Sequence, residues 1–421
     1  MGEKRLTTRT DDSSVPNWLK EAEKASVISD SFVSKNIKPI ILNMNIRNAD
    51  NALRDLCRQV EITRFIDVFD EQLAELFISD NAQLYKASLQ VKRSSVRDYL
   101  KNYKKGKSSW QLGSWVYYPW SGTLIHMLSE DEFIKLRTIR NQFIITADEQ
   151  EKYASYSVGC AGMSVGSNGA VAIAITGGSQ RIKLADGAVF SGSNLNRVRT
   201  GVKSVGLPKS IIIGRELYEM NPYLRIDAIT ENLSDKNITR FFDKPWKLDA
   251  VVDEIDDVII KIKLRLEARK RKIPVIMVTE PGDTVMLDVE RFDKDDSLPL
   301  FHGLLKDAER IAEAGSFKNE RERIKSIVKI IGTRNLPVRD QQAALKVGSV
   351  IPSAPQLGST AMIAGGVISY AIRQLATDAP LRSGRHAIDL NKIFWKPKDY
   401  LRYKINHETK TRNLNRVIGN M

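Results

Sequence analysis

The fold is decided by the stretch Val158-Gly159-Cys160-Ala161-Gly162-Met163-Ser164-Val165-Gly166-Ser167. A short apolar run leads into a turn that carries Gly162, Ser164 and Gly166, and a run of small residues follows at 170–175. This order predicts a strand, a tight turn and a closely packed helix. The first backbone amides of such a helix are suited to hold a phosphate group.

The turn alone supports two interpretations. Gly162-x-Ser164-x-Gly166 is half of a dinucleotide-binding fingerprint, and it also spells the nucleophile elbow of serine hydrolases, with Ser164 as the nucleophile. The next predicted strand, 181–186, ends in Asp186, about 20 positions after the turn, where a Rossmann-type half-fold places a carboxylate for a ribose hydroxyl. A hydrolase elbow does not require that residue, so the nucleotide site is favoured.

Four further motifs follow in a fixed order: Ser193-Asn194-Leu195-Asn196-Arg197, Gly206-Leu207-Pro208-Lys209, Asn221-Pro222 and Asp253-Glu254-Ile255-Asp256. Together with the turn and the acidic residue after it, they resemble the ThiF, MoeB and ubiquitin-activating-enzyme superfamily. The resemblance covers residues 137–293 and, more weakly, 355–389. It implies an α/β, Rossmann-like ThiF-type nucleotide-binding fold with a mostly parallel sheet.

The resemblance also implies that ATP and Mg²⁺ activate a carboxylate as an acyl adenylate. It assigns nucleotide binding to Gly162, Ser164, Gly166, Asp186, Ser193, Asn194, Arg197 and Lys209. Among these, Asp186 would bind the ribose, and Asn194 and Arg197 would bind the phosphates. Lys209 would bind both the phosphates and the ribose. Asp256 would hold the magnesium ion.

A further arginine is assigned to the site of a neighbouring chain. The segment 137–142 resembles a family motif whose second arginine, here Arg140, reaches across a dimer to the partner's ATP. We therefore expect a homodimer, with the apolar segment 360–375 as a helix that supplies surface to bury. The predicted catalytic residues are Arg140, Arg197, Lys209 and Asp256.

These roles suit the chemistry. Attack of a carboxylate on the α-phosphate builds negative charge on phosphate oxygens, so the site needs fixed cations and a metal ion more than an acid or a base. Arg140 and Arg197 each carry a planar guanidinium that can donate two parallel hydrogen bonds to a phosphate. Lys209 supplies a compact positive charge, and Asp256 supplies a hard oxygen ligand suited to Mg²⁺.

In ubiquitin-activating enzymes, the cysteine that forms a thioester with the activated carboxylate lies on a loop after the position of Lys209. The chain has two cysteines, Cys57 and Cys160, and neither follows Lys209. The resemblance therefore implies that this chain forms no such thioester. Two cysteines also exclude a four-cysteine structural zinc site. The predicted substrate is a peptide or a small protein. A tRNA-modifying dehydratase of the same fold is an alternative, and a catalytically silent interaction module, motivated by the short glycine turn and by Ala188, is another.

Composition limits the partners and the compartment. The 421 residues carry a formal net charge of +14, which favours an anionic partner such as ATP, an acidic peptide or, less favoured here, a nucleic acid. No apolar segment follows Met1, and the longest apolar run, 361–372, is too short to span a bilayer. We expect a cytoplasmic protein without a membrane partner.

We expect three regions. Residues 1–130 form an N-terminal α+β module that opens with a polar arm to about residue 31, residues 131–300 form the ATP-binding domain, and residues 301–421 pack on it, contribute to the dimer and end in a basic tail. By analogy with the family, the N-terminal module would hold a leader peptide by strand addition.

Two basic segments are predicted to be ordinary surface. Five cations and two tyrosines in 97–107 precede an aromatic run, which favours a surface loop before a buried strand over a grip for single-stranded nucleic acid or peptide. The helix predicted at 256–272 is rich in Lys and Arg, and we expect its basic face to be solvated.

Overall fold

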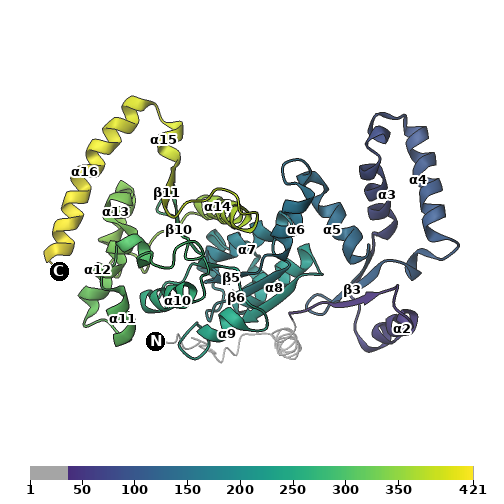
Figure 1. Ribbon diagram of the computed structural model, residues 1–421, viewed down its shortest axis with the longest axis horizontal. Coiled ribbons are helices and arrows are strands. Elements are labelled where there is room, and N and C mark those ends of the chain that lie inside the picture. Colours follow the sequence, from purple (N-terminus) through teal and green to yellow (C-terminus); the bar gives the residue numbers. More distant parts are fainter. Residues whose placement is uncertain (1–36, 421) are drawn as a thin grey trace, which may run out of the picture.

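Two β-sheets organise the residues described by the computed structural model, 37–420 (Figure 1). One has four strands in the order β1-β3-β4-β2, and the other has seven in the order β11-β10-β9-β8-β5-β6-β7. The polar arm predicted before residue 31 lies outside the described residues. The division of the chain at residues 130 and 300 stays a proposal. Strand β11 belongs to the last of the three proposed regions, but it pairs with β10 of the middle region.

The four-stranded sheet carries its own helices. In chain order the elements are β1 (Ile40–Asn43), α2 (Ala49–Gln59), β2 (Arg64–Asp67), α3 (Phe69–Asp80), η1 (Ala82–Lys86), α4 (Leu89–Lys104), η2 (Ser109–Gln111), β3 (Ser114–Tyr118), β4 (Thr123–Met127) and α5 (Glu130–Thr138). Strand β3 pairs antiparallel with β1 and β4, and β2 pairs parallel with β4.

The seven-stranded sheet alternates with helices. Its first half contains η3 (Ile139–Asn141), α6 (Ala147–Ser155), β5 (Val158–Ala161), α7 (Gly166–Ile175), β6 (Arg181–Ala185), η4 (Gly192–Asn196), η5 (Val202–Ser204), α8 (Lys209–Met220), β7 (Arg225–Ile229) and α9 (Ile238–Asp243). The second half contains β8 (Ala250–Asp253), α10 (Val258–Lys270), β9 (Val275–Thr279), β10 (Thr284–Glu290), η6 (Leu300–Gly303), α11 (Ala308–Ala314), α12 (Glu320–Ile331), η7 (Thr333–Asn335), α13 (Val338–Ala344), α14 (Gly358–Ala376), β11 (Gly384–Asp389), α15 (Leu390–Phe394) and α16 (Pro397–Asn420).

The strand order confirms the predicted mostly parallel sheet. Strands β7, β6, β5, β8 and β9 are parallel, and β10 and β11 join one edge antiparallel. From β5 the chain continues outward through β6 and β7, and then returns to place β8 on the other side of β5. The carboxyl ends of β5 and β8 therefore meet at a switch point, where ligands bind in open α/β sheets.

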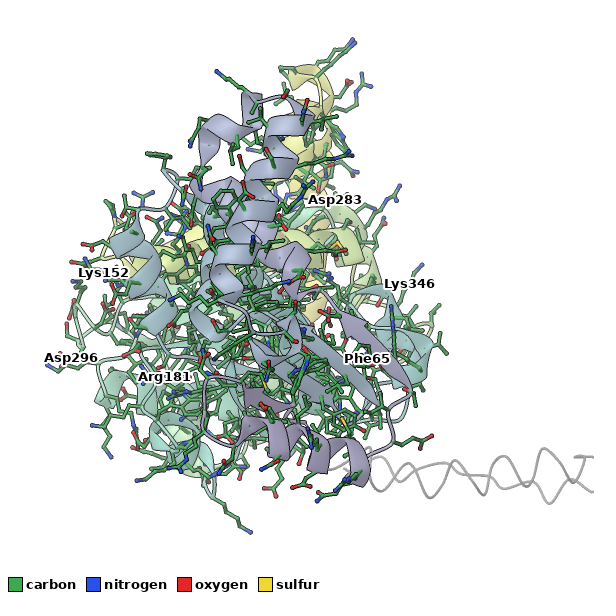
Figure 2. The ribbon with its side chains drawn as sticks, turned by 90° about the vertical axis from the view of Figure 1, so that its right-hand side faces the viewer. Phe65, Lys152, Arg181, Asp283, Asp296 and Lys346 are labelled. Carbon is green, nitrogen blue, oxygen red and sulfur yellow. The ribbon has the colours of Figure 1, made fainter. Side chains whose placement is uncertain are left out.

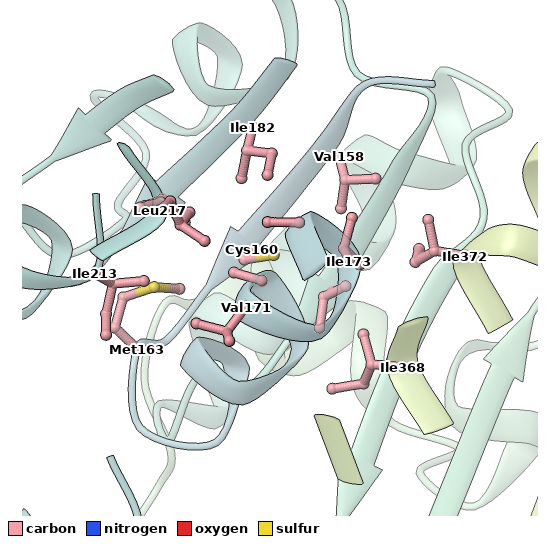
Figure 3. Close-up of a cluster of buried hydrophobic side chains, with 14 of the residues drawn as sticks. Val158, Cys160, Met163, Val171, Ile173, Ile182, Ile213, Leu217, Ile368 and Ile372 are labelled. Atoms are coloured by element: carbon pink, nitrogen blue, oxygen red, sulfur yellow. The ribbon is translucent and has the colours of Figure 1, made fainter. Parts of the chain in front are cut away.

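Helices α7 and α14 pack against each other on one face of the sheet, with α7 over β5 and β8 and α14 over β9 and β10. Figure 3 shows the side chains of α7 packed between Val158 of β5 and Ile368 of α14, in a core that continues into α8. A Cβ atom on Gly169 would lie 2.9 Å from Ile368, and one on Gly365 would lie 2.6 Å from the Asn168 carbonyl oxygen. The small residues therefore let the two helices approach closely.

The opposite face of the sheet is covered by α9, α10 and α11, around a second core. The expectation that the basic face of α10 is solvated was wrong for Arg265, which is fully buried. Its guanidinium pairs with Asp253 and Glu290, at the ends of β8 and β10. The residue pattern of one helix does not show that carboxylates from neighbouring strands will pair with a cation on that helix and allow it to be buried.

The basic segment 97–107 was predicted as a loop and is mostly helix. Residues up to Lys104 belong to α4, and the chain then turns into β3, whose five residues are all buried as predicted. The basic tail is also helical and forms α16. This helix packs on α13, and the side-chain amide of Gln341 in α13 donates to the Thr411 hydroxyl in α16 at 2.9 Å. Across residues 37–420, every helix is too short or too polar to cross a membrane.

Candidate active site at the switch point of the sheet

The predicted strand, glycine turn and helix are all present. Strand β5 ends at Ala161, Gly162 has φ +93°, and α7 begins at Gly166. A Cβ atom on Gly162 would lie 2.2 Å from the Glu254 carbonyl oxygen, so only glycine fits this position. The turn therefore brings the N-terminus of α7 against the segment that follows β8, and a helix N-terminus favours the binding of an anion.

Asp186 and Lys209 meet at this turn. One oxygen of the Asp186 carboxylate accepts a hydrogen bond from the Met163 amide at 2.7 Å, and the other accepts one from the Ala188 amide at 2.7 Å. The Lys209 ammonium lies 3.9 Å from Asp186, and both side chains are 12% exposed. The structure thus places an acid, a lysine and the glycine turn together, from three segments of the chain.

Arg197 also lies on the turn. Its Nε donates to the Ser164 hydroxyl at 2.8 Å, and its Nη1 donates to Asn196 at 2.9 Å. Burial lowers the pKa of Arg197, against the opposing charges of Glu280 and Asp256. The guanidinium is therefore a half-buried cation at the start of α7.

Asn194 shapes the segment that carries Arg197. Its side-chain oxygen accepts from the Ser191 amide at 3.0 Å and from the Ser191 hydroxyl at 3.2 Å. In residues 37–420 the Asn194 amide nitrogen has no hydrogen-bond acceptor, so that end of the side chain is the one able to donate to a phosphate. Ser193 is exposed on the same short helix.

The two aspartates of the Asp253-to-Asp256 motif have different surroundings. Asp253 is buried, where it pairs with Lys261 at 3.1 Å and with Arg265. Asp256 is exposed, and the next residue, Asp257, caps α10 by accepting from the Ile259 amide at 2.8 Å. Asp256 is therefore the carboxylate of the motif that is open to a ligand.

The described part of the chain holds no group of three or more His, Cys, Asp or Glu side chains placed to bind a metal ion. A magnesium ion at Asp256 would take its other oxygen ligands from water and from the phosphates of a bound nucleotide. Such a ligand set is usual for Mg²⁺ in nucleotide-dependent enzymes.

Two residues that the sequence did not indicate belong to this edge of the sheet. Glu280 follows β9, is 7% exposed, and accepts from the Gln356 amide at 3.0 Å. Burial raises its pKa to about 7, although Gln356 and Arg197 oppose the shift. The Gln356 carbonyl accepts from Asn196 at 2.9 Å, so the chain ahead of α14 crosses over the segment that carries Arg197.

Arg140 lies apart from the other predicted residues. It is exposed on η3, and its neighbour Asn141 donates to the Thr176 carbonyl at 3.0 Å. Thr176 follows the last residue of α7, whereas the site is at the first. The ten residues of that helix put about 15 Å between its two ends.

The hydrolase interpretation of Ser164 has no support in this geometry. The Ser164 hydroxyl accepts from Arg197, and the hydrogen bonds and ion pairs found for the four histidines go to other residues. A serine nucleophile requires a base within hydrogen-bonding reach.

The sequence profile of the ThiF family matches residues 136–397. The chain belongs to the ThiF family. All the predicted site residues lie inside the match, whereas the four-stranded sheet and its helices α2, α3 and α4 lie before it.

Two proteins are similar in sequence to part of this ThiF-family chain. An uncharacterized protein of Mycobacterium tuberculosis (strain CDC 1551 / Oshkosh) is 34% identical over 277 residues, which are 66% of this chain and 38% of that protein. The tRNA threonylcarbamoyladenosine dehydratase of Bacillus subtilis (strain 168) is 29% identical over 201 residues, which are 47% of this chain and 75% of that protein. The chain thus spans well under half of the first relative.

Among solved structures, E. coli MccB is 18% identical with a TM-score of 0.39, over 57% of this chain and 65% of that one. The E. coli tRNA N6-threonylcarbamoyladenosine dehydratase, TcdA, is 19% identical with a TM-score of 0.42, over 58% of this chain and 95% of that one.

Proposed function

We propose that this ThiF-family chain is an ATP-dependent adenylyltransferase that activates a carboxylate, on a peptide or a small protein, as an acyl adenylate. The observation that carries the proposal is the meeting of Asp186, Lys209 and Arg197 at the Gly162 turn. An acceptor for ribose hydroxyls and two cations stand beside a helix N-terminus, and each has the residue type that this reaction needs.

The residues present fit a bound nucleotide. Gly162 lets the backbone turn tightly, and the Asp186 carboxylate is already fixed by two backbone amides, so it can accept from a ribose without reorganising. Arg197 and Lys209 would hold phosphate oxygens and oppose the charge that develops on them. Bound ATP supplies the adenylyl group and the pyrophosphate leaving group, and Asp256 would hold its Mg²⁺.

The acyl group would pass to a nucleophile other than a cysteine of this chain. Cys160 is buried within β5, where burial raises the pKa of its thiol to about 12, so it stays protonated and unreactive. Cys57 is exposed on α2, outside the family match. We infer that an amide, an amine, a sulfur donor or an internal nucleophile of the substrate takes the activated acyl group.

Isotope exchange tests this proposal. The chain is incubated with ATP, Mg²⁺, labelled pyrophosphate and candidate peptides that end in a free carboxylate, and label is followed into ATP. We expect peptide-dependent exchange that Lys209→Ala lowers by about two orders of magnitude or more. The exposed Lys236→Ala is the matched control and should leave exchange unchanged. Absence of exchange with every carboxylate would contradict the proposal.

A second candidate is a tRNA-modifying dehydratase, which uses the same carboxylate activation on a nucleoside. The Bacillus subtilis relative that bears this name is matched over 75% of its length. Sequencing and nucleoside analysis of copurified RNA distinguish the two candidates. Binding to tRNA that is no tighter than binding to random RNA at moderate salt would argue against the dehydratase.

We also propose that the protein is a homodimer in which Arg140 serves the partner's site. The supporting observation is that Arg140 lies near the far end of α7 from its own chain's site. The outer face of α14 exposes Met362 and Tyr370 at 59% and 49%, beside an apolar cavity of about 650 Å³. A twofold interface on this face would let both chains donate the same arginine.

A further inference from the structure

Helices α3 and α4 form a hairpin that stands away from the seven-stranded sheet (Figure 1), and Figure 2 views the molecule from the side on which the hairpin lies. The inner face of α4 holds the pair together, because Tyr99 stacks on Phe77 with ring centroids 4.2 Å apart. Tyr103 donates to Glu132 of α5 at 2.6 Å. No residue of α4 is fully buried, and the hairpin lies outside the family match.

The outer face of α4 carries a ridge of cations, which we call the α4 ridge. It consists of Arg93, Arg97, Lys101 and, at the C-cap, Lys105, and all four side chains are exposed. Residues four apart on a helix lie about 6 Å apart along its axis, so the ridge is roughly 18 Å long. Within residues 37–420 none of the four has an acidic partner, although the neighbouring Lys104 is held by Asp70 at 2.6 Å.

Helix stability does not account for the ridge. Its members are like charges at four-residue spacing, which destabilises a helix by roughly 0.2–0.5 kcal/mol per pair. The helix dipole favours Lys101 and Lys105 at the C-terminal end of α4, but it gives no support to Arg93 or Arg97, which lie outside the last turn. From residue 86 to residue 107 the chain has eight Lys or Arg residues and one acidic residue, Asp98. A solvated helix face would normally mix both signs.

We propose that the α4 ridge binds the phosphate backbone of a folded RNA. A nucleic-acid duplex carries about one charge per 1.7 Å of axis, so an 18 Å ridge faces on the order of ten phosphates and can neutralise four of them. The ridge is thus long enough to follow a backbone, and its cations are free to exchange water for phosphate oxygens.

An exposed aromatic side chain against the first turn of α4 favours RNA over duplex DNA. Tyr85, on η1 between the two helices, is 74% exposed, and Lys92 of α4 lies 5.4 Å from its ring centroid. An exposed ring beside cations can stack on an unpaired base, which folded RNA offers in loops and bulges. This surface is separate from the adenylation site, so the inference stands or falls independently of the proposed reaction.

Fluorescence anisotropy with the full chain tests the inference. The probes are labelled unfractionated tRNA, a DNA duplex of similar charge and polyglutamate, each titrated over a range of salt concentrations. The variant Arg93→Gln/Arg97→Gln/Lys101→Gln/Lys105→Gln keeps good helix formers on the ridge. The control Lys306→Gln/Lys329→Gln/Lys346→Gln/Lys398→Gln removes four exposed charges from the C-terminal region.

We expect tRNA to bind more tightly than DNA or polyglutamate. The ridge variant should weaken tRNA binding by at least about tenfold near 0.1 M salt and reduce the log–log salt slope by about 4, or one per cation removed. The control should change neither. If the ridge variant unfolds, Arg93→Gln/Arg97→Gln alone should reduce the slope by about 2. Equal tRNA binding by wild type and a folded ridge variant, or tighter binding of DNA or polyglutamate, would overturn the inference.

Discussion

Removal of the Arg265 guanidinium should strongly destabilise the seven-stranded sheet and the helices that pack on it. Arg265 is fully buried, and its Nε donates to Glu290 at 2.6 Å while its Nη1 donates to Asp253. Its Cζ lies 4.0 Å from the centroid of the Phe301 ring. Burial alone would lower the pKa of Arg265, but Glu290 and Asp253 outweigh it and raise the pKa. The cation is therefore held charged by its two partners.

Arg265→Met keeps most of the side-chain volume and removes the charge. Glu290 then loses its Arg265 partner, and of its two cations Asp253 keeps Lys261, at 3.1 Å. Breaking a buried pair in this way typically costs about 3–5 kcal/mol, because a buried charge is left uncompensated. For a domain of 150–250 residues this corresponds to a fall in Tm of roughly 6–20 °C.

The matched control is Arg269→Met, four residues later on α10. Arg269 is 27% exposed and pairs with Glu309, which is 59% exposed, so its loss should cost about 0–1 kcal/mol. Differential scanning calorimetry of the full chain compares the two variants at neutral pH. Equal Tm values for the two variants would refute the reasoning, since the buried network would then contribute no more than a surface pair.

Three further predictions follow from the site. Gly162→Ala should lower the free energy of unfolding by about 1–3 kcal/mol more than Gly106→Ala, because both have positive φ but only the first would place Cβ 2.2 Å from a backbone oxygen; equal losses by chemical denaturation would contradict this. Burial raises the pKa of Glu280 to about 7, so the folded state keeps a proton that the unfolded state releases, and stability falls as pH rises from about 4.5 to 7. Glu280→Gln should therefore gain about 3 kcal/mol over wild type between pH 4.5 and 8, and a pH-independent difference would exclude that titration. If Arg140 acts across a dimer, mixtures of Arg140→Ala and Lys209→Ala chains should recover up to about half of wild-type exchange per mixed dimer, whereas no recovery, or a monomer in solution, would exclude it.

The parts of the site that the sequence predicted are those fixed by local order along the chain. The Gly162 turn and Asp186 each follow a strand whose pattern is readable in the sequence, and the parallel topology brings the carboxyl ends of these strands together. Arg197 and Lys209 were located instead by motifs that resemble those of the ThiF superfamily, Ser193-Asn194-Leu195-Asn196-Arg197 and Gly206-Leu207-Pro208-Lys209.

The parts that the sequence did not predict depend on contacts between distant segments. Gln356 and Glu280 are 76 residues apart, and nothing in either segment indicates the other. The buried position of Arg265 depends on Asp253 and Glu290, which come from two other strands. The segment 97–107 was predicted as a loop because its cations dominate the pattern, although the apolar and aromatic residues of α4 keep helical spacing at Val96, Tyr99, Leu100 and Tyr103.

The central claim is that the Gly162 turn, Asp186, Lys209 and Arg197 form an ATP site, and isothermal titration calorimetry of the full chain tests it most directly. The chain is titrated with ATP and with 2′,3′-dideoxy-ATP in the presence of Mg²⁺. We predict micromolar binding of ATP, at least about tenfold weaker binding of the dideoxy analogue, and loss of this difference in Asp186→Asn, since the difference reports hydrogen bonds from the ribose to a carboxylate. No binding of ATP would contradict the account and favour a catalytically silent interaction module, and equal binding of both nucleotides to the wild-type chain would contradict the ribose-binding role of Asp186.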